Sequence, residues 1–491
     1  MNPTANAASV SAFLLYLGVV VLIGVLSTRF SSSGIAEYFV GGRRMNRYVV
    51  ALSAVVSGRS AWLLLGMTGL AYARGASALW AVVGYIVVEL FLFLFYGRRL
   101  RRFSEAHDCV TVPDFFAARF DDRRGILRLL LVVILLIFLV GYVAAQFVAG
   151  GKAFAAGFGL EPMQGVWLTA GIILVYTLLG GFLAVSLTDL MQAFLMLLAL
   201  VVLPLVAITQ AGGWGAVLAE LRALDPVLAD PGAIALGTLL GFLGIGLGSP
   251  GNPHILTRFM SIRDAEQLRT AAFVGTLWNV LMAGGAVLIG LAGRAYFASP
   301  DLLPAGDTEN LYPVLAQQLL HPFLFGLVVA SIFAAIMSTA DSQLLVAASS
   351  VVRDLYEKVL QRDREVPQRR LVMLSRVVVF LLVLGALALG LLAEDLVFWL
   401  VLFSWAGLGA ALGPTSILAL FWRRTTWAGV VAGLVSGALV TIVWKLTAPF
   451  GGFYELIPAF FASLLATVLV SLATRPPEQA DQLFAAGRRS D

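Results

Sequence analysis

Long apolar runs recur along nearly the whole chain, each about as long as a helix that spans a bilayer. A helix of about 20 apolar residues crosses the hydrocarbon core, and lipid leaves no water for unpaired backbone groups. With windows of about 19 residues, we expect an all-α polytopic membrane protein of about 13 transmembrane helices. They are placed near 10–28, 48–72, 77–97, 126–154, 164–182, 186–209, 232–251, 271–297, 322–350, 371–393, 397–421, 426–448 and 454–474.

Composition agrees with lipid as the solvent. The chain of 491 residues is 60% hydrophobic and 12% charged, against roughly 45–50% apolar and about 25% charged in soluble domains. A net charge of +5 could indicate a protein that binds nucleic acid. The basic residues lie in short loops instead of one patch, so we expect a lipid bilayer as partner and no nucleic acid.

The basic residues also predict an orientation. Of the 33 Lys and Arg residues, 27 fall on one side of the expected spans and 5 on the other, with Arg59 inside a span. By the positive-inside rule this favours a plasma (inner) membrane protein with its N-terminus outside and its C-terminus cytoplasmic. We expect one transporter domain over 1–474 and a cytoplasmic tail over 475–491.

Catalytic chemistry finds no support in the residues. The single cysteine, Cys109, has no partner, and the three histidines are far apart in sequence, so no cluster has metal-ligand spacing. No nucleophile and base pattern falls within a span. We expect neither an enzyme nor a bound cofactor. A gated channel is the alternative from another class, although no pore-lining repeat or ring of charge is evident.

Two expected spans carry helix-breaking residues. The span 48–72 contains Ser57-Gly58-Arg59-Ser60 in its middle, and the span 232–251 ends in a Gly- and Pro-rich run. These spans lie five apart and cross in opposite directions, as inverted five-helix repeats require, and broken helices indicate a transporter site at mid-membrane. Glycines used for close helix packing are the alternative interpretation.

Polar residues at membrane depth are further candidates. An Arg at the centre of a span costs roughly 2.5–3.5 kcal/mol, so Arg59 needs a partner such as Glu89, Asp189 or Asp341. Hydroxyls inside the span 322–350, with carbonyls of a nearby unwound helix, suit a hard monovalent cation. Hydroxyls that hold helices together are the alternative.

Several motifs in order resemble the sodium:solute symporter family, and specifically its sodium/proline branch. They include Tyr38 to Arg43 (YFVGGR), Thr111 to Phe116 (TVPDFF), Gly181 to Asp189 (GFLAVSLTD), Pro253 to Met260 (PHILTRFM) and Met337 to Thr339 (MST). The similarity covers almost the whole chain. It implies a LeuT-type fold of two inverted five-helix repeats, approximately 48–209 and 232–421, with one helix before and two after.

The resemblance also implies a function and a set of residues. An inward Na⁺ gradient would drive symport of a small zwitterionic solute, L-proline in this branch, by alternating access. By position in the family's motifs, the implied sites are the following: a Na⁺ site of backbone carbonyls at Val56, Arg59 and Ala335 with the hydroxyls of Ser338 and Thr339; Asp189 for cation coupling; Arg43 for gating; and a solute site lined by Ser60, Trp62 and Tyr142.

This chain departs from the branch where ion and solute meet. The branch commonly reads Ser-Asp-Met-Ser-Gly-Trp where this chain has Gly58 and Arg59 within Ser57 to Trp62, and Ile245 and Ser249 replace a Trp and a Tyr. We count these four positions with the solute site.

Three hypotheses for Arg59 follow. It binds the carboxylate of the solute, or it replaces Na⁺, or an acid such as Glu89 neutralises it and leaves Na⁺ binding intact. The alternative function is therefore a Na⁺-independent or proton-coupled carrier of a carboxylate-bearing solute anchored by Arg59, so the coupling ion is Na⁺ or H⁺.

Overall fold

The computed structural model describes residues 6–27, 34–179, 181–362, 364–392, 396–447 and 453–475. Within these ranges the chain is helical, without a named strand. Ten helical stretches are long and apolar enough to cross a membrane: Ala7–Ser27 (α1), Trp62–Ala106, Ile126–Phe158 (α8), Phe182–Gln210 (α10), Ala265–Tyr296, Pro322–Leu360, Gln368–Leu391 (α17), Val397–Phe421 (α18), Trp427–Thr447 (α19) and Leu456–Ala473 (α20).

The remaining helices lie within or between these stretches. The expected count of 13 spans stays a prediction, because three apolar helices are shorter than a full span. These three are α3 (Arg47–Ser57), α9 (Pro162–Leu179) and α12 (Leu236–Gly244) with the 3₁₀ stretch that continues it to Gly251. The other helices are α2 (Ile35–Val40), α4 (Met67–Arg74), α5 (Leu79–Phe91), α6 (Gly97–Ala106), α7 (Val112–Phe120), α11 (Trp214–Leu224), α13 (Pro253–Ser261), α14 (Leu268–Tyr296), α15 (Leu311–Leu319) and α16 (Pro322–Ser349).

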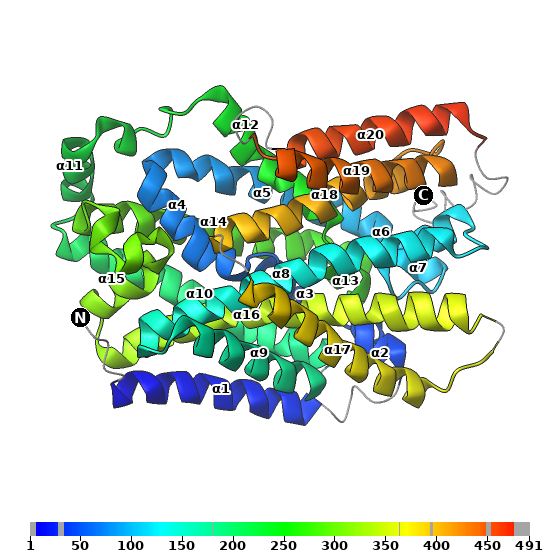
Figure 1. Cartoon of the computed structure of the whole chain (residues 1–491), viewed down its shortest axis with the longest axis horizontal. Coiled ribbons are helices and arrows are strands. Elements are labelled where there is room, and N and C mark those ends of the chain that lie inside the picture. The colour runs from blue at the N-terminus through cyan, green and yellow to red at the C-terminus, as the bar shows by residue number, and fades with distance from the viewer. Residues whose placement is uncertain are drawn as a thin grey trace.

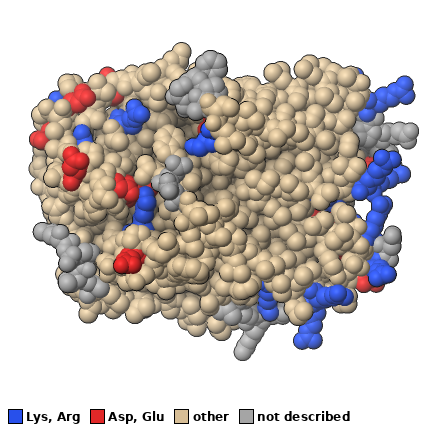
Figure 2. Space-filling view, in the orientation of Figure 1, with Lys and Arg blue, Asp and Glu red and all other residues tan. Residues whose placement is uncertain are grey.

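The long helices run along the long axis of the molecule, with α11 and α15 near one end and α6 and α7 near the other (Figure 1). Figure 2 shows a broad band with almost no charged side chains between two charged ends. About 83% of the most apolar window is buried in α18 and in the stretch that contains α16, against 33% in α1 and α20. Helices α16 and α18 therefore form the centre of the bundle.

The expected break in the second span is present. Helix α3 starts at the N-cap Asn46, whose side chain accepts a 2.8 Å hydrogen bond from the Tyr48 N–H, and it ends at Ser57. Ser60 then adopts a left-handed conformation, with φ at 50°. Because a non-glycine residue is strained there, surrounding contacts must fix the turn. The chain continues through a π-helical turn into α4.

The seventh span is also broken, and its apolar helical stretch ends at Gly251, as expected. Helix α12 passes into a tight 3₁₀ stretch, Ile245–Gly251, and after the extended residue Asn252 the chain resumes as α13. The break therefore lies at the end of this span and is followed by a second helix, α13. Proline suits the first turn of a helix, so Pro253 starts α13 where the hydropathy pattern indicated a loop.

Glycines let this break lie directly against α18. A Cβ placed on Gly248 would overlap the indole of Trp405, and one on Gly251 would overlap the backbone at Leu408. Close approach of two backbones is a role that glycine alone fills. The Gly-rich run thus positions the second break beside the central helix. Of the predicted tail, only Arg475 lies within the described residues.

Candidate solute and cation site

A small cavity lies where the two broken helices face α5, α8 and α18. Its volume is about 10 Å³, which is room for one water molecule, so an amino acid would enter only if the side chains around it moved. Five of the predicted solute-site residues line it together. The lining residues are Gly58, Arg59, Trp62, Tyr85, Tyr142, Ile245, Val401, Leu402 and Trp405.

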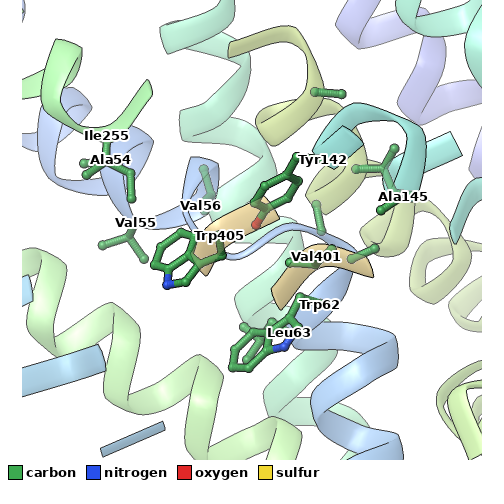
Figure 3. Close-up of a cluster of buried hydrophobic side chains, with 14 of the residues drawn as sticks. Ala54, Val55, Val56, Trp62, Leu63, Tyr142, Ala145, Ile255, Val401 and Trp405 are labelled. Carbon is green, nitrogen blue, oxygen red and sulfur yellow. The ribbon is translucent and has the colours of Figure 1, made fainter. Parts of the chain in front are cut away.

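Four of the nine residues that line the cavity are aromatic. Figure 3 shows Trp62, Tyr142 and Trp405 grouped near the break in α3, with Val401 of α18 beside them. Trp62 lies edge-on to Tyr85, with 5.9 Å between ring centroids. The Trp405 indole donates a 2.8 Å hydrogen bond to the Ile245 carbonyl, which links α18 to the second break. Sequence reasoning did not single out Trp405, because an aromatic residue in a span carries no local signal of its partner.

Arg59 is held by two other helices. It is 2% exposed, forms an ion pair with Glu89 of α5, and donates a 2.9 Å hydrogen bond from Nε to Asn279 Oδ1 of α14. Asn279 also donates to Glu89, at 2.7 Å, and the guanidinium lies 3.9 Å from the ring centroid of Tyr85. Of the three acids that were candidate partners, the structure pairs Arg59 with Glu89.

Two predicted solute-site serines do not line the cavity. The Ser60 hydroxyl accepts a hydrogen bond from the Trp62 N–H at 3.1 Å and lies 3.4 Å from the Tyr142 hydroxyl. Ser60 therefore positions two residues that line the cavity. Ser249 is buried on the 3₁₀ stretch, and its hydroxyl has no hydrogen-bond partner within the described ranges.

A group of oxygen atoms lies on the other side of the α3 break. The Ser338 hydroxyl of α16 is 3.4 Å from the Val56 carbonyl and 3.1 Å from the Ala335 carbonyl. The Thr339 hydroxyl donates to the Ser57 carbonyl at 3.0 Å. The structure thus brings together four of the five residues of the predicted Na⁺ site. The fifth, the Arg59 carbonyl, accepts the Leu63 N–H at 3.2 Å.

Asp189 belongs to a buried charged cluster next to these oxygen atoms. Its Oδ2 accepts hydrogen bonds from Ser53 at 2.6 Å, from Ser57 at 3.3 Å and from Arg258 at 3.1 Å. Arg258 is one of the 27 basic residues on the more basic side of the expected spans, but it does not lie in a solvent-exposed loop, because it belongs to α13 and is 1% exposed.

The same cluster reaches α16. Arg258 also donates to Ser342, whose hydroxyl is 2.7 Å from the Ser338 carbonyl and 3.1 Å from Asp341 Oδ1. The cluster thus connects α10 and α13 with the predicted Na⁺ ligands on α16. Hydropathy alone gave no sign of it, because its members lie in four separate segments.

Arg43 lies far from the cavity, at a bend after α2. Its guanidinium donates to Asp108 Oδ1 at 3.0 Å and to the carbonyls of Ser104 and Cys109 at 3.1 and 3.0 Å. Arg43 therefore fixes the connection between α6 and α7. This geometry is a candidate basis for the predicted gating role.

Two broken helices that face each other across a cavity, with a separate set of oxygen atoms at one break, define a membrane-embedded carrier of small solutes. The chain belongs to the sodium:solute symporter family, whose model matches residues 38–437. Its class is sodium-coupled solute symport, as the resemblance indicated.

Curated relatives match over nearly the full length. The high-affinity proline transporter PutP of Bacillus subtilis is 38% identical, over 94% of this chain and 97% of its own. The osmoregulated proline transporter OpuE of the same organism is 37% identical over 95% of each chain. The sodium/proline symporter of Staphylococcus aureus is also 37% identical, over 96% of this chain and 94% of its own. These relatives are transporters rather than enzymes.

Solved structures confirm the LeuT-type fold. A Na⁺-coupled sialic acid symporter in an outward-open state covers 96% of this chain and 99% of its own, with a TM-score of 0.79 at 20% identity. MhsT in complex with L-phenylalanine covers 88% of this chain and 99% of its own, with a TM-score of 0.57 at 15% identity.

Proposed function

We propose that this protein is a Na⁺-coupled symporter of L-proline that works by alternating access. One observation carries the proposal: the break in α3 contributes to both candidate sites. Val56 and Ser57 on one side face the hydroxyls of α16, whereas Gly58, Arg59 and Trp62 on the other side line the cavity. An ion that fixes the carbonyls at the break also fixes the cavity wall, which is a direct route to coupling.

Arg59 does not oppose this coupling. An uncompensated guanidinium a few ångströms from Na⁺ would repel it by several kcal/mol in a low-dielectric site. The ion pair with Glu89 and the hydrogen bond to Asn279 direct the guanidinium toward α5 and α14, away from the hydroxyls of α16. The structure thus favours the hypothesis that Glu89 neutralises Arg59 over the Na⁺-independent or proton-coupled alternative.

The residues that line the cavity suit a small ring that carries a carboxylate, once the side chains move to admit it. Ile245, Val401 and Leu402 offer apolar contacts. The Trp62 Nε1 and the Tyr85 hydroxyl are buried and have no hydrogen-bond partner within the described part of the chain. Buried donors without partners are costly, and an anionic group of a ligand satisfies them. L-Proline combines an apolar ring with such a group, and the curated relatives named above are proline transporters.

Topology is the last part of the proposal. The band nearly free of charge and the Lys and Arg side chains at the α6–α7 end (Figure 2) support a single transporter domain, 1–474, in the inner membrane. That end would be cytoplasmic, together with the C-terminus, and the N-terminus would be outside.

Labelled proline uptake into proteoliposomes tests the function, with Na⁺, K⁺ and pH gradients imposed separately. We expect uptake above the diffusion background with an inward Na⁺ gradient alone. Uptake driven equally by a pH gradient without Na⁺ would favour the proton-coupled alternative, and no uptake under any gradient would reject proline. Counterflow then separates a carrier from a gated channel, because only a carrier is accelerated by unlabelled proline on the opposite side.

A further inference from the structure

The Arg59–Glu89 ion pair lies at the wall of the solute cavity. Arg59 lines the cavity, and Glu89 lies directly behind it, 3% exposed. Asn279 bonds to both members, accepting from Arg59 at 2.9 Å and donating to Glu89 at 2.7 Å. A positive charge thus borders the space in which the solute would bind, and its compensating negative charge is fixed one side chain further back.

One nitrogen of the Arg59 guanidinium makes only a weak hydrogen bond. Its Nη2 is committed to Glu89 and its Nε to Asn279, but its Nη1 has only a 3.4 Å contact with the neighbouring Gly58 carbonyl. A guanidinium that lines a cavity and keeps a nitrogen with one weak contact is suited to a carboxylate. The Trp62 Nε1 and the Tyr85 hydroxyl are donors on the same wall.

We infer that the Arg59–Glu89 pair selects zwitterions: the solute carboxylate binds Arg59, and the negative charge of Glu89 behind Arg59 compensates the solute ammonium without touching it. The site is then neutral before and after binding. A solute with only a carboxylate leaves two anions for one guanidinium, and a solute with only an amine leaves two cations for one carboxylate. Uncompensated charge at membrane depth is strongly unfavourable, so both solutes are rejected.

The inference rests on the proposed amino-acid substrate, and it makes Glu89 a residue that determines specificity. Two analogues of proline isolate the two charges: tetrahydrofuran-2-carboxylate keeps the ring and the carboxylate, and pyrrolidine keeps the ring and the amine. Each competes with labelled proline for Na⁺-driven uptake into proteoliposomes. For the wild type we expect both analogues to compete at least about 100-fold more weakly than unlabelled proline, because each leaves a buried charge unpaired.

Two variants then identify the pair as the cause. In Glu89→Gln, unlabelled proline should compete more weakly and tetrahydrofuran-2-carboxylate should compete more strongly. The preference for proline over this analogue should therefore fall by about tenfold or more. The double variant Arg59→Met/Glu89→Gln contains neither charge and avoids a buried unpaired guanidinium, so it keeps the test open if the single variant does not fold. It should also lose the discrimination. Glu161→Gln, at an exposed position, is the control and should keep the wild-type ratio.

The outcomes separate the inference from the proposed function. Absence of Na⁺-driven proline uptake in the wild type would defeat the function and the inference with it. Proline uptake with equal competition by tetrahydrofuran-2-carboxylate would defeat the inference alone. A double variant that discriminates as well as the wild type would also defeat it, because the pair would then be only structural.

Discussion

Arg258 Nη2 lies 3.1 Å from Asp189 Oδ2, and both side chains are fully buried. This ion pair joins α13, directly after the second helix break, to α10. Because Asp189 also accepts hydrogen bonds from Ser53 and Ser57 of α3, the two broken helices meet at one carboxylate. Asp189 therefore links the two breaks directly through its hydrogen bonds and its ion pair.

Removing one member of this pair should destabilise the protein. Asp189→Asn or Arg258→Met leaves a buried charge without its partner, at a cost of roughly 3–5 kcal/mol. Thermal unfolding in detergent should show a large loss of stability for each single variant. The double variant Asp189→Asn/Arg258→Met should lose less than the sum of the two. Additive losses would show that the two side chains are not energetically coupled.

The hydroxyls of α16 should control the response to Na⁺. Ser338→Ala and Thr339→Ala each remove one candidate ligand, and we expect the Na⁺ concentration for half-maximal proline uptake to rise by about tenfold or more. Ser375→Ala is the matched control, since the Ser375 hydroxyl bonds to the Leu371 carbonyl of its own helix. An unchanged Na⁺ dependence in both variants would place the ion elsewhere.

A methyl group at Gly248 should disturb the packing of the second break against α18. The added Cβ of Gly248→Ala would overlap the Trp405 indole, and overpacking of this kind costs about 1–3 kcal/mol. Gly237→Ala is the control, because a Cβ at Gly237 of α12 meets nothing within 4 Å. Unfolding measurements should show that Gly248→Ala is less stable than the wild type and that Gly237→Ala is at least as stable as the wild type.

Asp114 of α7 should make stability sensitive to acid. Burial opposes its ionisation, but Arg128, 2.6 Å away, and Arg353 outweigh burial and hold the pKa of Asp114 below its ordinary value. A lowered pKa stabilises the fold above about pH 4, where the carboxyl ionises in the unfolded chain, and this stability is lost as the pH falls through the folded-state value.

Comparison with Asp114→Asn checks this dependence. The variant should be less stable than the wild type by about 1–3 kcal/mol near neutral pH. The difference in melting temperature should shrink as the pH is lowered below about pH 4. A difference that stays constant with pH would show that the carboxylate charge is not responsible.

Cys109 offers a chemical readout of Arg43. Burial raises the pKa of the Cys109 thiol, and its side chain is 2% exposed, so the native thiol should react slowly with maleimides at neutral pH. Arg43→Ala removes the donor to the Cys109 carbonyl, so the connection between α6 and α7 should open more often. Mass spectrometry should show labelling at least about tenfold faster. Equal labelling rates would contradict this anchoring role.

The sequence pattern predicted the helical bundle and the place of both breaks because their causes are local. Runs of apolar residues indicate the spans, and the sequence from Ser57 to Ser60 contains a glycine and a charge that a lipid-exposed helix would not tolerate. The pattern failed at α13. Its polar residues lowered the hydropathy there, and nothing in the neighbouring sequence showed that Arg258 pairs with a carboxylate 69 residues earlier.

The sequence likewise identified some residues of the candidate site and missed others. Trp62 and Tyr142 could be named from family motifs, and they do line the cavity. Asn279 could not, since its contact with Arg59 joins residues 220 positions apart and exists only in the folded protein. Tertiary contacts of this kind decide which polar residues in a membrane bundle share a site.

The ion pair at the cavity wall also constrains how this chain can change over generations. A lineage that replaces Arg59 alone leaves Glu89 unpaired at membrane depth, and the reverse replacement leaves Arg59 unpaired, so each single step should cost stability. The two positions, 30 residues apart on α5 and at the α3 break, should therefore change together. Descendants of this chain should retain both residues or have exchanged both.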